Sequence, residues 1–319
     1  MITKNIDIAV KALLEEQVIG MPTETVYGLA GSIHSEKAIQ RIFELKQRPV
    51  SNPLIVHIAD MNQLNDIASE IPQKAILLAK AFWPGPLTLI LKKKSTVSDL
   101  ITAGNQTVAV RIPSHPVALE LLQKVNVPLA APSANPFTGI SPTRSKHVQN
   151  YFGDDLSVIL EGGICIRGVE STIIGFDGDQ AILYRHGAIS IEEIEKIVGK
   201  IETKTTSEKT AKSIAPGMYS KHYAPKTKTI VTKEPELYFN QNPDKKIGYI
   251  SLRKYHPEHS RQYQVVLSWK GDLREAVSRF YDSLHFLDAQ NLDYILVKPF
   301  PNRGLGRTLN DRLNRACGG

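Results

Sequence analysis

Two cationic side chains, Lys46 and Arg48, flank Gln47 in the stretch KQRPVSNPLIVHI over residues 46–58. The stretch follows a predicted helix over 35–45 and enters an apolar, β-branched run over 54–58 that predicts a buried strand. Prolines within the connection restrict its backbone and reduce the entropy lost when it closes on a ligand. Such a loop can bind phosphate or carboxylate, although a solvated surface loop with ordinary basic residues is the alternative.

Hydroxyl and carboxyl groups follow a short predicted strand over 18–21. The segment PTETVYGLAG over 22–31 carries them, together with glycines that allow close backbone approach: Thr23, Glu24, Thr25 and Tyr27. This combination predicts a pocket wall. A threonine-rich strand whose hydroxyls face water is the alternative.

The segment TVAVRIP predicts a strand over 107–112. Alternation sends Val108 and Val110 to one face, and Thr107, Ala109 and Arg111 to the other. If the valines face the core, Arg111 projects from the opposite face of the sheet, where it can bind an anion or make a surface salt bridge.

Small and hydroxyl residues gather in APSANPFTGISPT over 131–143, between an apolar strand and a helix predicted to begin near 143. Backbone amides and hydroxyls before a helix suit phosphate oxygens. The chain has no GxxxxGK[ST] motif, so this is not a Walker loop. Further along, Ser171 opens a predicted strand, Arg185 lies in another, and Ser190 caps a helix predicted to end near 198.

Composition limits the classes of protein. The chain has 319 residues, 42% hydrophobic and 22% charged, which predicts a folded protein of two domains. A net charge of +7 favours anionic partners such as nucleotides or RNA. Its cysteines, Cys165 and Cys317, are too far apart for a zinc cluster and fit a reducing compartment. No signal peptide or membrane span is recognised, so we expect a cytoplasmic protein.

The composition changes after the first two hundred residues. We predict a first domain over 1–200, a linker over 201–227 that begins charged and threonine-rich, and a second domain over 228–319. The linker part IAPGMYSKHYAPKT has aromatic residues and turns that a mere tether does not need, and a mobile lid is one option. Strands predicted over 229–232, 247–252, 265–269 and 294–297, with a helix over 272–290, indicate a small parallel sheet.

Several motifs together resemble one family: PTETVYGLAG, KQRPVSNPLIVH, WPGPLTLIL, TVAVRIPSHP, APSANPFTGISPT, GVESTII and APGM…HYAP. In order and spacing they are similar to the long, two-domain form of threonylcarbamoyl-AMP synthase with its YrdC-like catalytic domain. The resemblance implies an α/β fold, with a YrdC-like twisted mixed sheet and helices, plus a small C-terminal Rossmann-like parallel-sheet domain. It also implies the reaction of L-threonine, bicarbonate and ATP to threonylcarbamoyl-AMP and pyrophosphate, for threonylcarbamoyladenosine in tRNA.

The resemblance also assigns residues. It implies an ATP site at Lys46, Arg48, Asn52, Thr107, Ser133, Asn135, Ser141, Arg185 and Tyr219. It implies a threonine site at Thr23, His57, Arg111 and Ser171, with Arg111 on the carboxylate. Lys46 and Arg48 are the implied catalytic residues, as ligands of phosphate and carbamate.

Some of these assignments leave alternatives open. His57 could instead be a packed strand histidine. The family usually has an aromatic residue two positions after the linker methionine, whereas here Tyr219 follows Met218 directly and Ser220 comes next, which puts the stacking role of Tyr219 in question.

No cluster of acidic residues offers a protein-built metal site, so magnesium is expected to arrive with ATP. The HPEH segment over 256–259 is interpreted as a loop with solvated histidines. Expected partners are the downstream tRNA threonylcarbamoyl transferase machinery and, weakly, tRNA itself. The rival classes are an RNA-binding module without catalysis and a carbamoyl transferase of the hydrogenase-maturation type, whose zinc-finger cysteine pairs are missing here.

Overall fold

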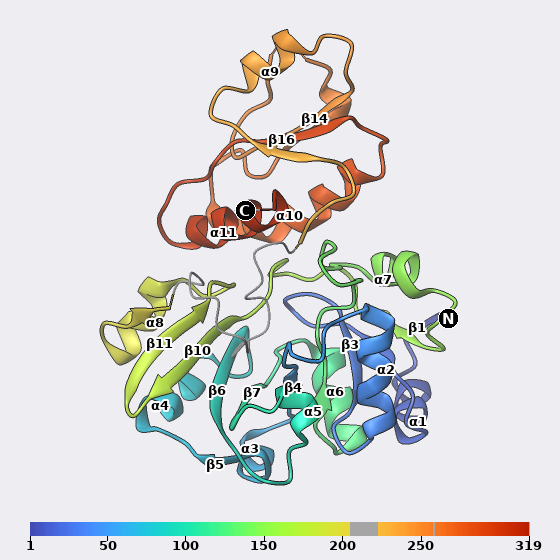
Figure 1. Ribbon diagram of the computed structural model, residues 1–319, viewed down its shortest axis with the longest axis vertical. Coiled ribbons are helices and arrows are strands. Elements are labelled where there is room, and N and C mark those ends of the chain that lie inside the picture. The colour runs from blue at the N-terminus through green and yellow to red at the C-terminus, as the bar shows by residue number, and fades with distance from the viewer. Residues whose placement is uncertain (205–222, 258, 319) are drawn as a thin grey trace.

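The computed structural model describes residues 1–204, 223–257 and 259–318. Figure 1 shows a large domain that holds the N-terminus and, above it, a smaller domain that holds the C-terminus. Each domain has its own sheet, so the predicted α/β class with a second, smaller sheet is confirmed. Tyr219 and most of the predicted lid lie outside the described residues.

The described residues of the large domain form a 12-stranded mixed sheet. Its order is β1 (Ile2–Thr3), β9 (Ile159–Leu160), β2 (Ile19–Met21), β3 (Gly28–Ser32), β8 (Leu129–Ala130), β4 (Ile55–His57), β7 (Thr107–Arg111), β6 (Leu87–Lys93), β10 (Thr172–Asp177), β11 (Gln180–Arg185) and β12 (Glu202–Thr203), with β5 (Ala68–Glu70) also on β6. The last strand, β12, uses two residues of the predicted linker.

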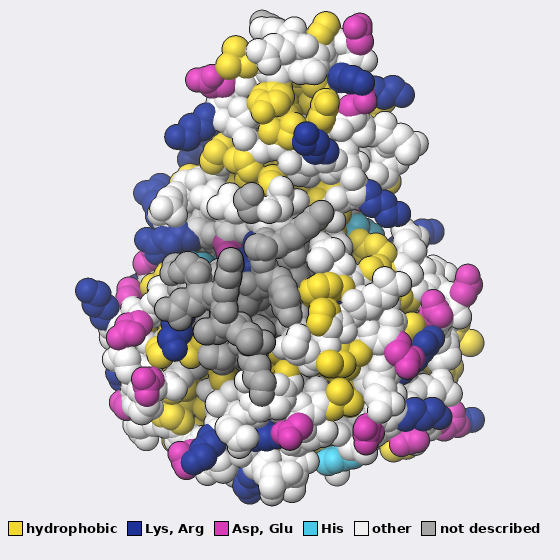
Figure 2. Space-filling model, in the orientation of Figure 1, with side chains coloured by type: hydrophobic (Ala, Val, Ile, Leu, Met, Phe, Trp, Pro, Cys, Tyr) yellow, Lys and Arg dark blue, Asp and Glu magenta, His cyan; other side chains and the backbone are white. Residues whose placement is uncertain are grey.

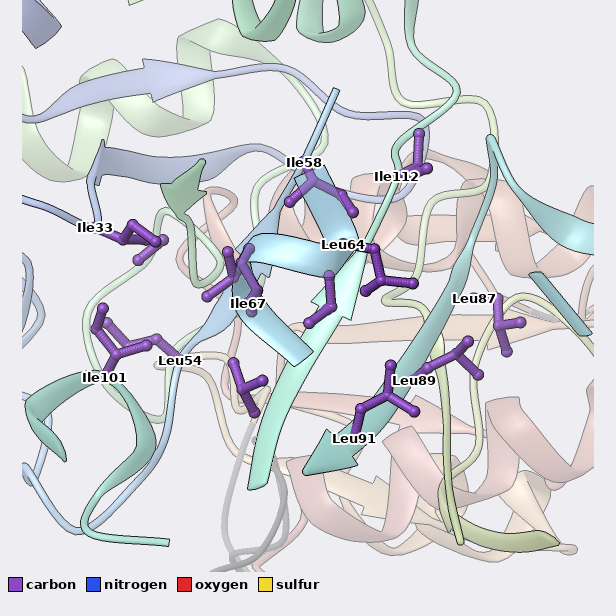
Figure 3. Close-up of a cluster of buried hydrophobic side chains, with 14 of the residues drawn as sticks. Ile33, Leu54, Ile58, Leu64, Ile67, Leu87, Leu89, Leu91, Ile101 and Ile112 are labelled. Carbon is purple, nitrogen blue, oxygen red and sulfur yellow. The ribbon is translucent and has the colours of Figure 1, made fainter. Parts of the chain in front are cut away.

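Alternation along the central strands separates two faces. Leu87, Leu89 and Leu91 of β6 point together into the main core, which Figure 3 shows beneath Leu64 and Ile67 of α3 (Met61–Ile67). The opposite face carries a much smaller apolar cluster, built from Ile55, Ile90, Ala109, Ile173 and Tyr184. Because that face has few apolar residues to bury, it is free to present polar groups.

Helices cover the large sheet where the sequence supplies apolar stripes and caps. They are α1 (Ile6–Leu14), α2 (Glu36–Lys46), α3 (Met61–Ile67), α4 (Gln73–Phe82), α5 (Asp99–Thr102), α6 (Pro116–Val125), α7 (Ser145–Phe152) and α8 (Ile191–Val198). Ser35 begins α2 by accepting a hydrogen bond from the Ala38 amide, and Ser190 begins α8 in a capping box with Glu193. The predicted Ser190 cap is thus confirmed.

The small domain is a four-stranded parallel sheet in the order β13 (Thr229–Val231), β16 (Tyr294–Val297), β14 (Ile247–Ser251) and β15 (Gln264–Val266). Its helices are α9 (Pro235–Gln241), α10 (Leu273–Asp288) and α11 (Leu305–Ala316), with a 3₁₀ turn at Arg261–Tyr263. In the HPEH segment, His256 is buried and packs on Phe239, so its predicted solvation is wrong. The aromatic surface of α9 supplies the apolar partner that the sequence motif did not reveal.

The two domains meet through α10 and α11, which Figure 1 shows on the side of the small sheet that faces the large domain. One apolar cluster crosses this junction, joining Ile140 and Val169 to Tyr281 and Leu309. Figure 2 shows Lys and Arg side chains on both flanks of the junction. None of the described helices is long and apolar enough to cross a membrane.

Some local predictions are wrong. The apolar pattern over 60–70 predicts one helix, but α3 ends at Ile67, and Ala68–Glu70 instead forms β5 against Lys92 and Lys93. Helix α6 was not anticipated, and β3 lies mostly within the segment over 22–31, for which a pocket wall was predicted with a strand as the alternative. The GLAGS sequence of β3 has little intrinsic strand preference, and β3 forms by antiparallel pairing with β2 and β8.

Candidate active site

One hollow on the large domain gathers polar side chains from segments that are distant in the sequence. It is lined by Thr23, Thr25, Val26, Gly28, Arg48, Ile55, His57, Arg111, Ala131, Pro132, Ser133, Glu170, Ser171, Arg185 and Tyr223. The predicted site residues in this lining are Thr23, Arg48, His57, Arg111, Ser133, Ser171 and Arg185. The structure therefore brings together residues from most of the chemical motifs.

Strands β4 and β7 position two of these residues. His57 and Arg111 are register partners in this parallel pair. Both side chains are buried, and both share a sheet face with Ile55 and Ala109, away from the main core. The strand alternation in 107–112 predicted this face for Arg111. Because Arg111 is buried in the hollow, the alternative of a surface salt bridge is wrong.

The Arg111 guanidinium is held on several sides. Its Nη1 donates to Thr25 Oγ1 at 2.8 Å, its Nε donates to the Gly85 carbonyl at 3.1 Å, and its Nη2 lies 2.5 Å from Glu24 Oε1. The other Glu24 oxygen accepts from the Ser114 amide. Together these contacts need only three of the five N–H groups of the guanidinium, so Arg111 can still donate to a ligand.

The Thr23 hydroxyl organises the turn before β3. It donates to the Val26 carbonyl at 2.6 Å and accepts from the backbone amides of Thr25 and Val26. This is a local side-chain to backbone turn, which fixes the Thr25 hydroxyl beneath Arg111.

Lys46, the last residue of α2, and Arg48, two residues after it, have different contacts. The Lys46 Nζ donates to the carbonyls of Ser133 at 2.5 Å and Asn135 at 2.6 Å, so it fixes the 131–143 loop without itself lining the hollow. Arg48 does line it, and donates to the carbonyls of Asn52 at 3.1 Å and Pro53 at 2.8 Å. Burial and the nearby Arg48 charge lower the pKa of Lys46 well below its ordinary value.

The 131–143 loop contributes Ala131, Pro132 and Ser133 to the lining, and Ser133 is the predicted site residue among them. Asn135 and Ser141 are completely buried beside it and hold the loop: the Asn135 amide donates to the Gly139 carbonyl, and the Ser141 hydroxyl donates to Glu170. These two residues thus support the hollow from behind.

The far wall is formed where β10 begins and β11 ends. Arg185 Nη2 donates to both the carbonyl and the hydroxyl oxygen of Ser171 at 3.0 Å, and the Ser171 hydroxyl also lies 2.7 Å from Thr88 Oγ1. Because Arg185 is fully buried, desolvation lowers its pKa below the ordinary value. A buried cation in the wall of the hollow is suited to an anionic ligand.

Besides Lys46, Asn135 and Ser141, two further predicted residues within the described part of the chain do not line the hollow. Thr107 lies at the opposite end of β7 from Arg111 and borders a different hollow, with Gln106 and Tyr184. Asn52 is fully buried next to Arg48, and neither of its amide atoms has a partner in the described part of the chain. Tyr219 is outside the described residues.

Sequence reasoning assigned no ligand role to Thr25, Glu170 and Tyr223, all of which line the hollow. Glu170 directly precedes the assigned Ser171, and Thr25 lies two residues after the assigned Thr23. Tyr223 belongs to HYAP, which supplied an aromatic signal within the same segment as Tyr219. The sequence could not show the role of Glu170 and Tyr223, because both contact the C-terminal domain only in the folded structure.

Electrostatics also bears on His57. Burial and the neighbouring Arg111 charge lower the pKa of His57 to about 3. The imidazole is therefore neutral near pH 7, where it acts as a hydrogen-bonding group and not as a cation.

The comparisons with known proteins agree with this geometry. Residues 11–187 match a family model described as "Telomere recombination", and residues 189–318 match one described as "Threonylcarbamoyl-AMP synthase, C-terminal domain". The chain is 38% identical to threonylcarbamoyl-AMP synthase of Bacillus subtilis, over 98% of this chain and 92% of that protein. It belongs to the threonylcarbamoyl-AMP synthase family.

Threonylcarbamoyl-AMP synthase of Pyrococcus abyssi is 40% identical, over 98% of this chain and 94% of that protein. A crystal structure of P. abyssi Sua5 complexed with L-threonine superposes with a TM-score of 0.91 at 38% identity, covering 98% of this chain and 94% of that chain. The chain is thus a threonylcarbamoyl-AMP synthase with both domains of the long form. The rival interpretations, a non-catalytic RNA-binding module and a hydrogenase-maturation carbamoyl transferase, are wrong.

Proposed function

We propose that this threonylcarbamoyl-AMP synthase uses L-threonine, bicarbonate and ATP as its substrates. The threonine amine, after losing its proton, attacks bicarbonate, and a carbamate forms as water leaves. A carbamate oxygen then attacks the α-phosphorus of ATP, and the bond to pyrophosphate breaks. No protein nucleophile is required, so the enzyme's task is to position the reactants and neutralise charge.

The threonine would lie against Thr23, His57, Arg111 and Ser171. The remaining N–H groups of Arg111 can donate to the threonine carboxylate. The neutral imidazole of His57, its register partner, can form a hydrogen bond with the threonine hydroxyl. The observation that carries this assignment is that these residues share one hollow in a chain whose fold matches the P. abyssi protein complexed with L-threonine. Selection against serine would rest on one methyl group, worth about 1–3 kcal/mol.

ATP would lie along Arg48, Ser133 and Arg185, on the other side of the same hollow. Arg48 and Arg185 supply fixed positive charge for the phosphates. Lys46, Asn135 and Ser141 would hold the loop that carries Ser133, and Asn52 offers two unpartnered amide atoms beside Arg48. Tyr219 remains a proposed nucleotide contact, and Thr107 a more remote one.

Magnesium would be held by the ATP phosphates and by water. The described residues include no group of three or more His, Cys, Asp or Glu side chains placed to bind a metal ion. The carboxylate of Glu170, in the lining, is already paired with Arg312, and that of Glu24 is paired with Arg111. When bound, the ion would offset charge on the phosphates that Arg48 and Arg185 approach.

The product would pass to the tRNA threonylcarbamoyl transferase machinery. The net charge of +7, and the Lys and Arg side chains on the flanks of the domain junction, support weak tRNA binding as well.

The test is pyrophosphate release by the purified full-length chain. We expect release, with incorporation of labelled bicarbonate into an adenylate, only when ATP, Mg²⁺, L-threonine and bicarbonate are all present. L-Serine is the matched control substrate and should react more slowly. Equal ATP turnover without threonine would contradict the proposed reaction.

A further inference from the structure

Arg312, in the last helix of the C-terminal domain, reaches into the wall of the hollow. Its side chain is completely buried. Nε donates to Glu170 Oε2 at 2.8 Å, Nη2 donates to the His186 carbonyl at 2.6 Å, and Nη1 pairs with Asp311. The guanidinium carbon also lies 4.8 Å from the centre of the Tyr223 ring. A side chain of the small domain is thus anchored to two segments of the large one.

Glu170 receives this contact directly at the active site. The residue lines the hollow and is 5% exposed. Its Oε1 accepts from the Ser141 hydroxyl at 2.6 Å, and its Oε2 accepts from both Arg312 and the Tyr281 hydroxyl, the latter at 3.0 Å. The C-terminal domain therefore supplies two of the three side-chain donors recorded for a carboxylate that stands next to Ser171.

Glu170 needs these donors because burial strongly disfavours its charge. Desolvation alone would raise its pKa, but Arg312, Arg185 and the Ser141 hydroxyl hold the pKa below the ordinary value. A buried carboxylate that loses its cation must find another one or take up a proton. Arg185 is the other arginine whose charge lowers the pKa of Glu170, and it also supports Ser171 and lines the hollow.

We propose that Arg312 is a positioning residue of the active site: it holds Glu170 away from the substrate-binding cations and so keeps the 170–171 wall in place. This inference rests on the proposed function. It means that the C-terminal domain completes the active site through a defined contact, in addition to any role in binding partners. Tyr281 shares the task through its single hydroxyl.

The experiment is a double-mutant cycle on the full-length chain with Arg312→Met and Glu170→Gln. Arg312→Met should lower kcat/KM by at least about tenfold, because the freed carboxylate competes for Arg185. In the Glu170→Gln background, the same substitution should change kcat/KM by less than about twofold, since no competing charge remains. The double variant should therefore be more active than Arg312→Met alone, which simple damage to the domain contact would not produce.

Arg307→Ala is the matched control. Arg307 lies on the same helix and bonds Glu192 across the same junction at 2.9 Å, but it does not line the active-site hollow. It should leave kcat/KM unchanged. If Arg312→Met does not fold, Tyr281→Phe replaces it, with a smaller loss that Glu170→Gln again suppresses.

Two outcomes would overturn the inference: wild-type activity in Arg312→Met, or an equal loss in both backgrounds. The wild-type chain, assayed alongside, separates this from a failure of the proposed function. If it releases no threonine-dependent pyrophosphate, the reaction is wrong, whereas a normal wild-type rate leaves only the role of Arg312 in question.

Discussion

The Nη2 atom of Arg111 lies 2.5 Å from Oε1 of Glu24, and both side chains are buried. Arg111 lines the hollow on the side proposed for threonine, whereas Glu24 is not among the lining residues. The Glu24 carboxylate already neutralises the charge of Arg111 before a ligand binds. A ligand carboxylate must therefore accept hydrogen bonds from the Arg111 N–H groups that Glu24 does not use. The pair therefore favours a ligand that, like an amino acid, carries both an anionic group and a cationic one.

Arg111→Lys tests this arrangement. Lysine keeps the charge but cannot simultaneously donate to Gly85 and Thr25 and approach Glu24 as the planar guanidinium does. We expect the KM for threonine to rise roughly tenfold or more, with a smaller effect on the KM for ATP. Steady-state kinetics with each substrate varied in turn measures the difference. Arg41→Lys, at an exposed ion pair on α2, is the control, and an unchanged threonine KM in Arg111→Lys would contradict the assignment.

Lys46→Met should nearly abolish turnover. Methionine fills a similar volume but leaves the Ser133 and Asn135 carbonyls without their buried donor, so the loop that carries Ser133 loses its anchor. We expect kcat/KM to fall about 10²–10³-fold, the range found when a preorganised donor is removed from an active site. Pyrophosphate release measures the loss, and circular dichroism checks that the chain is folded. Lys37→Met, on the exposed side of the same helix, should behave as wild type, and a similar loss there would point to the helix instead.

The sequence correctly predicted strands whose buried residues follow a clear local pattern. It missed strands that form mainly because a neighbouring strand pairs with them. Strands β7 (Thr107–Arg111) and β16 (Tyr294–Val297) lie within one residue of the bounds predicted from the sequence. In contrast, β5 (Ala68–Glu70) continues the helical pattern of its sequence and is a strand only because β6 lies beside it. Intrinsic preference is weaker than the hydrogen bonds that a neighbouring strand offers.

The same distinction applies to the site. Arg111 was predicted to face away from the core because strand alternation is a local rule. Arg48 was predicted to bind phosphate or carboxylate because its loop is short and basic. Glu170 and Tyr223 were assigned no role, since their importance depends on Arg312, more than eighty residues further along the chain. A contact between domains leaves no local pattern in a single sequence.

His57 makes stability depend on pH. Its pKa of about 3 in the folded chain lies below the ordinary value of 6.5, so below about pH 6.5 the unfolded chain binds a proton that the folded chain does not. Stability therefore falls as the pH decreases through this range. Between about pH 7 and pH 5, this single group should cost the wild type about 2 kcal/mol relative to His57→Gln. Urea unfolding of both chains at the two pH values measures the difference, and parallel pH dependences would show that His57 is protonated normally.

Gly187, two residues after β11, packs closely against the backbone of Ser171 and Thr172 in the active-site wall. A Cβ atom at this position would lie 2.2 Å from the Thr172 nitrogen and 2.3 Å from the Ser171 carbonyl carbon, so Gly187→Ala must displace the segment that carries Ser171. We expect a loss of about 1–3 kcal/mol in the free energy of unfolding and a several-fold higher KM for threonine. Gly178→Ala is the matched control, because Gly178 has φ +55 but no atom within 4 Å of its Cβ position. It should lose about 1–2 kcal/mol through backbone strain and keep the wild-type KM. An equal KM change in both variants would mean that lowered stability, and not the position of Ser171, controls threonine binding.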